Sequence, residues 1–166
     1  MPELRIEITK RTDGGAVLRC TRADGSATWQ PHHRRQAAFF PLHDLTHYAV
    51  ESELGFRSGF YGLVADGWGI EDTGGKGARG PLPPEAIAVE HIVGSLDLER
   101  AGAAAWTAAD FNEQAAAFAA SGGRPVPRPL TDAEIVRVRD RALELFARWG
   151  ALAPGETLVL SFDRRR

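Results

Sequence analysis

The chain contains a single cysteine, Cys20, so it cannot form an internal disulfide bond. Small secreted domains commonly depend on such bonds, and their absence favours a reducing compartment. No stretch approaches the ~20 consecutive apolar residues that a membrane-spanning helix needs. The first residues, Met-Pro-Glu-Leu-Arg-Ile-Glu-Ile, alternate in polarity and lack the basic start and apolar run of a signal peptide. We therefore expect a cytoplasmic protein.

A strong charge of one sign is also missing, because the formal net charge is −2 at pH 7. Such a weak field does not draw a whole molecule to nucleic acid or to an anionic membrane. Two short basic runs, 32–35 and 164–166, are not interleaved with aromatic residues that could stack on bases. We expect neither a nucleic-acid partner nor a membrane partner.

The remaining composition is that of an ordinary globular protein. Hydrophobic residues make up 43% and charged residues 25% of the 166 positions, which fits a single domain over residues 1–166. Alternating apolar residues predict strands near 3–9, 16–22, 26–30 and 157–163. Asp13-Gly14 and Asp24-Gly25 fall between the first three of these, where tight hairpin turns favour glycine.

Helices are indicated by the residues at their boundaries. They are expected after Pro41, after Pro83-Pro84, from Thr107 to Gly122, and from Thr131 to Gly150. Apolar residues recur at helical spacing in the last of these and predict a core face: Ile135, Val138, Ala142, Phe146 and Trp149. The sequence therefore predicts an α+β fold, in which about four helices cover a mostly antiparallel four-stranded sheet made of three N-terminal strands and one C-terminal strand.

Residues 43–47 read His-Asp-Leu-Thr-His. Side chains one helical turn apart have Cβ atoms ~5–6 Å apart, so the imidazoles of His43 and His47 can reach one metal ion. The pattern resembles the zinc-peptidase motif His-Glu-x-x-His, in which the histidines bind zinc and the glutamate is the general base. The resemblance covers these five residues, and Asp44 stands at the glutamate position. It implies a divalent transition metal such as zinc on His43 and His47, with Asp44 activating a water.

Glu51 lies on the same face of the predicted helix and is a second candidate for activating the water. As a third metal ligand it would be stretched, because eight residues rise ~12 Å along a helix whereas metal–ligand bonds are ~2 Å long. The third ligand is expected from elsewhere: from Glu53 if the helix bends, from Asp66, or from His91. We prefer His91, because imidazole suits transition metals.

Two further segments bear on a binding site. Residues 55–69 combine glycines with large aromatics, which fits either the wall of a cleft beside the histidines or a packed turn region. Residues 75–80 match Gly-x-Gly-x-x-Gly by letter, but no strand precedes them and prolines follow. That loop is read as a surface loop, or as a lid whose Lys76 and Arg79 meet an anionic substrate.

These features leave several interpretations open. One is a small metal-dependent hydrolase acting on a small-molecule substrate. Another is a non-enzymatic protein that binds a small ligand in the same region. A third is a homodimer that buries Phe39 and Phe40 between its subunits. For the histidines themselves, the alternative to a metal site is a structural or solvent-facing pair.

Overall fold

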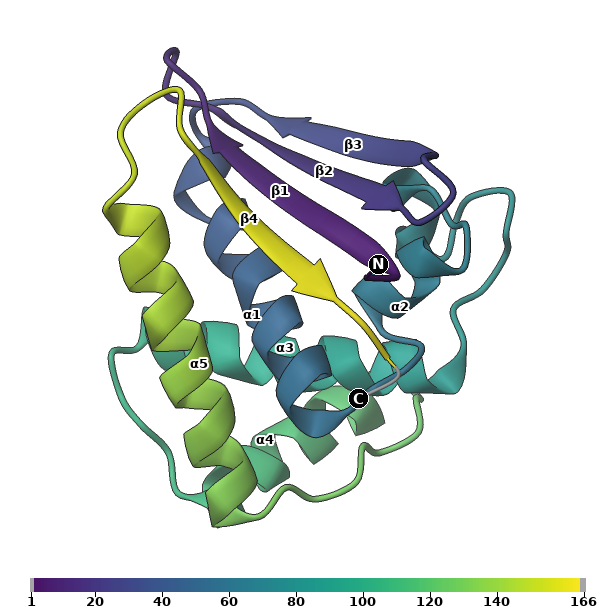
Figure 1. Ribbon diagram of the computed structural model, residues 1–166. Helices are drawn as coiled ribbons and strands as arrows, with labels where there is room; N and C mark the ends of the chain where they lie inside the picture. The colour runs from purple at the N-terminus through teal and green to yellow at the C-terminus, as the bar shows by residue number, and fades with distance from the viewer. Residues whose placement is uncertain (1, 165–166) are drawn as a thin grey trace.

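The computed structural model describes residues 2–164. Its strands form one antiparallel sheet in the order β3-β2-β1-β4, with all helices on one face (Figure 1). The strands are β1 Leu4–Lys10, β2 Ala16–Arg22, β3 Ala27–His32 and β4 Thr157–Phe162. The helices are α1 Phe40–Leu54, α2 Phe60–Ala65, α3 Pro84–Ala101, α4 Ala108–Ser121 and α5 Asp132–Gly150, with 3₁₀ turns at Gln36–Ala38 and Ile70–Gly74. The predicted α+β fold is confirmed.

The alternation of apolar residues builds the sheet as predicted. Ile6 pairs with Cys20 on one side and with Leu160 on the other, so buried side chains from the first, second and last strands form one apolar face. The predicted turn at Asp24-Gly25 is present, and Gly25 has a φ of 87°, which a residue with a side chain rarely adopts. The C-terminal strand lies beside the N-terminal one, so both ends of the chain contribute to the same sheet.

Helix α1 lies under the sheet and packs against both α3 and α5 (Figure 1). It is therefore covered on several sides, and Leu45, Ala49 and Val50 are fully buried. The hydroxyl of Tyr48 donates to the carbonyl of Ser161 at 2.8 Å, which joins the helix to β4. A helix covered in this way also buries some of the polar side chains that its sequence carries.

The sequence prediction misses helix α2 and misplaces one core residue. Residues 60–65 are helical, although their glycine and aromatic content suggested a cleft wall or a turn. In α5 the core contains Leu145 in place of the predicted Phe146. Phe146 is only partly buried and has the Arg100 guanidinium 5.3 Å from its ring centre. Among the described residues, no helix is both long and apolar enough to cross a membrane.

Candidate metal centre

The polar face of α1 is buried. His47, Glu51 and Asp44 expose only 2%, 1% and 6% of their surface. The interpretation in which this face contacts water is therefore wrong for these three residues. Buried polar groups require partners, because each loses its hydrogen bonds to water on folding. The partners come from α1 itself and from the neighbouring elements β3, α2 and α3.

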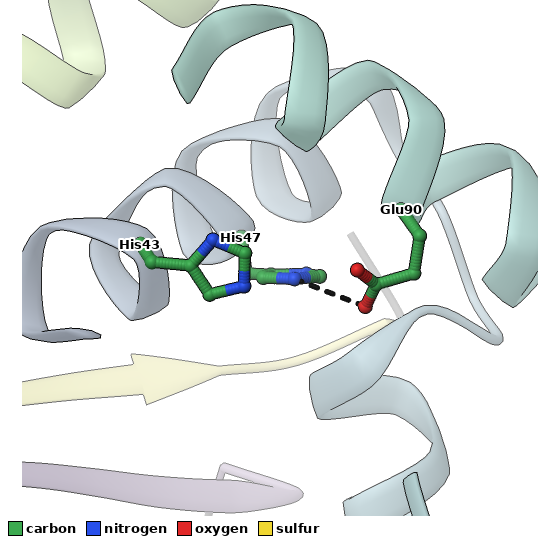
Figure 2. Close-up of side chains that lie close together, drawn as sticks. All are labelled: His43, His47 and Glu90. Carbon is green, nitrogen blue, oxygen red and sulfur yellow. Dashed lines mark ion pairs between the residues drawn. The ribbon is translucent and has the colours of Figure 1, made fainter. Parts of the chain in front are cut away.

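Three side chains converge where α1 faces α3. His43 and His47 extend from α1 toward the Glu90 carboxylate, which reaches across from α3 (Figure 2). One potential ligand atom from each of the three lies within 4.8 Å of the other two. Nε2 of His47 is 3.2 Å from Oε1 of Glu90. Ligand atoms on one tetrahedral zinc ion are roughly 3.3 Å apart for bonds near 2 Å, so small side-chain movements would complete the site.

Each histidine is held by a second carboxylate at its other ring nitrogen. Nδ1 of His43 lies 2.6 Å from Oδ2 of Asp97, and Nδ1 of His47 lies 3.2 Å from Oε2 of Glu51. A carboxylate at Nδ1 favours a proton there and leaves Nε2 as the ligand atom. Metal-binding histidines almost always have such a partner, which fixes the ring orientation and makes the ligand more basic.

The Glu51 carboxylate is itself fixed by the start of α2. The backbone N–H groups of Tyr61 and Gly62 donate to its Oε1 at 2.9 and 3.3 Å. The backbone comes this close because residue 59 is glycine: a Cβ there would lie 2.5 Å from the Glu51 carboxyl group. The glycine-rich segment after α1 therefore holds the residue that orients His47.

Charge in the metal-free site is centred on His47. Burial alone would lower the pKa of His47, but the nearby carboxylates of Glu90 and Glu51 outweigh burial and raise that pKa to about 10. For Glu90, burial acts in the opposite direction, yet attraction to His47 leaves its pKa below the usual value. A positive charge is thus strongly favoured between these carboxylates, whether a proton or a metal ion supplies it.

Asp44 and His32 form a second buried pair beside the cluster. Oδ2 of Asp44 is 3.6 Å from Nε2 of His32, and neither atom has a hydrogen-bond partner among the described residues. The His32 ring stacks on Phe40 with ring centres 4.8 Å apart. Both residues are more than nine-tenths buried, so Oδ2 of Asp44 is a buried oxygen that makes no hydrogen bond, within the described residues, in the residue that follows His43.

A pocket of about 440 Å³ opens onto these groups. His43, His47, Glu90 and Asp44 all contribute to its lining, together with residues from β3, α2 and the Ile70–Gly74 turn. This volume lies within the range of small-molecule sites. The cluster therefore lies at the wall of a pocket that is large enough for a small molecule.

The residues proposed from the sequence fall into different places. His43 and His47 are together in the cluster, Asp44 lines the pocket, and Glu51 lies behind His47 as its hydrogen-bond partner. Within the described chain, His91 is not part of the cluster, and its Nε2 is buried without a hydrogen bond. The residue before it supplies the third group, because on α3 it is position 90 that faces α1.

The sequence analysis did not identify Glu90 and Asp97 as neighbours of the two histidines. The two are seven residues apart on α3, which is two helical turns, so they lie on one face of the helix. Two carboxylates repeated at this spacing in a largely apolar helix were a detectable signal. His32 gave no such signal, because it lies at the end of β3 within a short basic run.

Comparisons with known proteins do not assign a function, so the functional assignment depends on this geometry. No protein-family model matches the chain, and neither a characterised protein nor a solved structure shows significant similarity to it.

Proposed function

We propose that the protein is a metal-dependent hydrolase whose His43, His47 and Glu90 hold a divalent transition metal such as zinc. The observation that supports this most is the convergence of the three ligand atoms within 4.8 Å at the wall of a pocket. Two histidines and one glutamate are the ligand set of zinc peptidases, in which the fourth position stays open for water or substrate. The carboxylates behind both histidines fit a prearranged site.

Asp44 is the residue best placed to move protons. It follows the first ligand in the sequence, as the general base does in the zinc-peptidase motif, and it lines the same pocket. A divalent ion at this site would polarise a substrate carbonyl and acidify a coordinated water. Asp44 would accept the proton as the water oxygen bonds to the carbonyl carbon, and would pass it to the leaving group as the old bond breaks.

Glu51 has a different role in this proposal. Its carboxylate is occupied by His47 and by two backbone N–H groups, so it positions a ligand and does not activate water. His91 has no role in the site.

The same ligand set also occurs in non-haem iron enzymes, so the identity of the metal must be measured. Ligand binding without turnover stays a prediction. The homodimer also stays a prediction, and Phe39, which it would bury, is 43% exposed in the single chain.

The test uses protein purified without a polyhistidine tag, stripped with a chelator and reloaded with zinc, cobalt, manganese or iron. Turnover of ester and amide substrates is then compared between wild type and Asp44→Asn. We expect metal-dependent hydrolysis, and we expect Asp44→Asn to lower kcat/KM by about 10²–10⁴-fold while the metal stays bound. Asp140→Asn, at an exposed carboxylate on α5, is the matched control and should leave hydrolysis unchanged.

Two results would overturn the proposal. One is hydrolysis that survives removal of the metal, or that Asp44→Asn leaves unchanged. The other is a stoichiometrically loaded protein that turns over no ester or amide with any of these ions, which would favour the ligand-binding alternative.

A further inference from the structure

The charged groups around the pocket are almost all of one sign. Its lining contains the carboxylates of Glu90, Asp44 and Glu71, and no lysine or arginine among the described residues. A divalent ion would bring two positive charges against these three negative ones. The loaded pocket would therefore still carry about one net negative charge before a substrate enters. This is the reverse of a site for phosphate esters, which proteins build from arginine, lysine and helix N-termini.

Glu71 is the carboxylate available to a ligand at the pocket edge. It is exposed, and it has neither a hydrogen bond nor an ion-pair partner among the described residues. The turn that carries it is fixed in place, because the N–H of Ile70 donates to the Thr28 hydroxyl at 3.1 Å and the Thr73 hydroxyl donates to the carbonyl of Ile70. Glu71 is thus an unpaired charge on an ordered segment.

The burial of Asp44, one of these three carboxylates, also favours a polar or positive ligand in this pocket. Its Oδ2 is buried and makes no hydrogen bond within the described residues; the nearest charged partner, Nε2 of His32, lies 3.6 Å away, and the residue lines the pocket. A buried carboxylate oxygen that makes no hydrogen bond is costly unless a ligand, water or ion meets it.

The rest of the lining is apolar and limits the size of the ligand. Four hydrophobic side chains from separate segments contribute to it: Phe40, Phe60, Ile70 and Leu82. With a volume of about 440 Å³, the pocket fits a small molecule and not a folded partner.

Resting on the proposed hydrolase function, we infer that the substrate is a small molecule in which an apolar group sits beside a protonated amine. The amine pairs with Glu71, the apolar group packs on Phe40 and Phe60, and the scissile carbonyl lies at the open metal position. Phosphate esters and carboxylate-bearing molecules are rejected by the surrounding carboxylates. Lys76 and Arg79 do not line this pocket, so they provide no counter-charge for an anion.

The test measures binding of simple metal-directed probes, so that it does not depend on knowing the substrate. Cobalt-loaded protein is titrated with three hydroxamates of equal chain length that end in an ammonium, a methyl or a carboxylate group. The visible spectrum of cobalt reports binding at the metal. We expect the ammonium probe to bind at least about tenfold more tightly than the carboxylate probe, with the methyl probe between them.

The variant Glu71→Gln tests the assigned residue. It should weaken the ammonium probe by up to about fivefold, as for an exposed ion pair, and leave the methyl probe unchanged. Glu113→Gln is the matched control and should change neither.

The possible failures are separable. If the carboxylate probe binds as tightly as the ammonium probe, or if Glu71→Gln leaves the preference intact, the inferred substrate class is wrong while the metal site stands. If cobalt binds but no hydroxamate alters its spectrum, the open metal position is absent and the proposed function fails with the inference.

Discussion

Oδ2 of Asp97 on α3 lies 2.6 Å from Nδ1 of His43 on α1, which ties the first proposed ligand to the helix that also carries Glu90. A carboxylate in this position fixes the ring and strengthens Nε2 as a ligand. Asp97→Asn should therefore weaken zinc binding by about 10–100-fold without abolishing it, as measured by competition with a chromophoric chelator.

The control for Asp97 is Asp140→Asn, an exposed carboxylate on α5 outside the site. It removes the same charge and should leave the affinity unchanged. An Asp97→Asn protein that binds zinc as tightly as wild type would show that the carboxylate serves only to join the helices.

Glu51 should matter for stability as well as for the metal. Glu51→Ala leaves His47 without its Nδ1 partner and leaves the N–H groups of Tyr61 and Gly62 without an acceptor. Breaking a buried ion pair in this way typically costs ~3–5 kcal/mol, so urea unfolding of the metal-free variant should show a loss of that order. Glu53→Ala, two residues along the same helix, should cost much less; equal losses would contradict the role given to Glu51.

The pH dependence follows from His47. Its pKa in the metal-free folded protein is raised to about 10 from an ordinary value of 6.5. Between these values the folded state binds more protons than the unfolded state, so stability from this group is complete below pH 6.5 and is lost as the pH rises toward 10. A His47→Gln protein should lack this decline in urea unfolding measured across that range.

Metal binding should release the same proton. With His47 protonated at neutral pH, calorimetric titration with zinc in buffers of different ionisation enthalpy should show about one proton released per ion. The apparent affinity should then rise by up to about tenfold per pH unit. Zinc binding without proton release would show that the metal does not replace the proton of His47.

Leu145 and Phe146 separate the core face of α5 from its edge. Leu145 is fully buried, whereas Phe146 is partly covered beside Arg100. Leu145→Ala should cost ~2–5 kcal/mol in denaturant unfolding, because it leaves a cavity. Phe146→Ala should cost less, since part of its surface already contacts water. The reverse order would place Phe146 on the core face.

The sheet could be predicted because its pattern is local. Alternating residues such as Ile6 and Ile8 identify the inward face, and the Asp-Gly turns fix how the strands pair. Helix α2 could not be recognised in the same way, because Phe60–Ala65 is too short to show a helical period and contains glycine. The alignment of α1 with α3 depends on tertiary packing, which no local pattern contains.

The site was predictable only as far as one helix carries it. His43 and His47 share a helix face by spacing alone, so their proximity followed from the sequence. The choice between Glu90 and His91 depended on how α3 is rotated about its axis, and a difference of one residue turns a side chain by about 100°. Preference for imidazole over carboxylate selected His91, whereas in the structure Glu90 lies with the two histidines.

The most direct measurement is the zinc stoichiometry and affinity of untagged wild type, Glu90→Gln and His91→Gln. The account predicts one ion per chain in wild type, a large loss of affinity in Glu90→Gln, and unchanged binding in His91→Gln, with thermal stability rising on zinc addition only where zinc binds. Absence of zinc uptake by wild type, or binding that depends on His91 and not on Glu90, would contradict it.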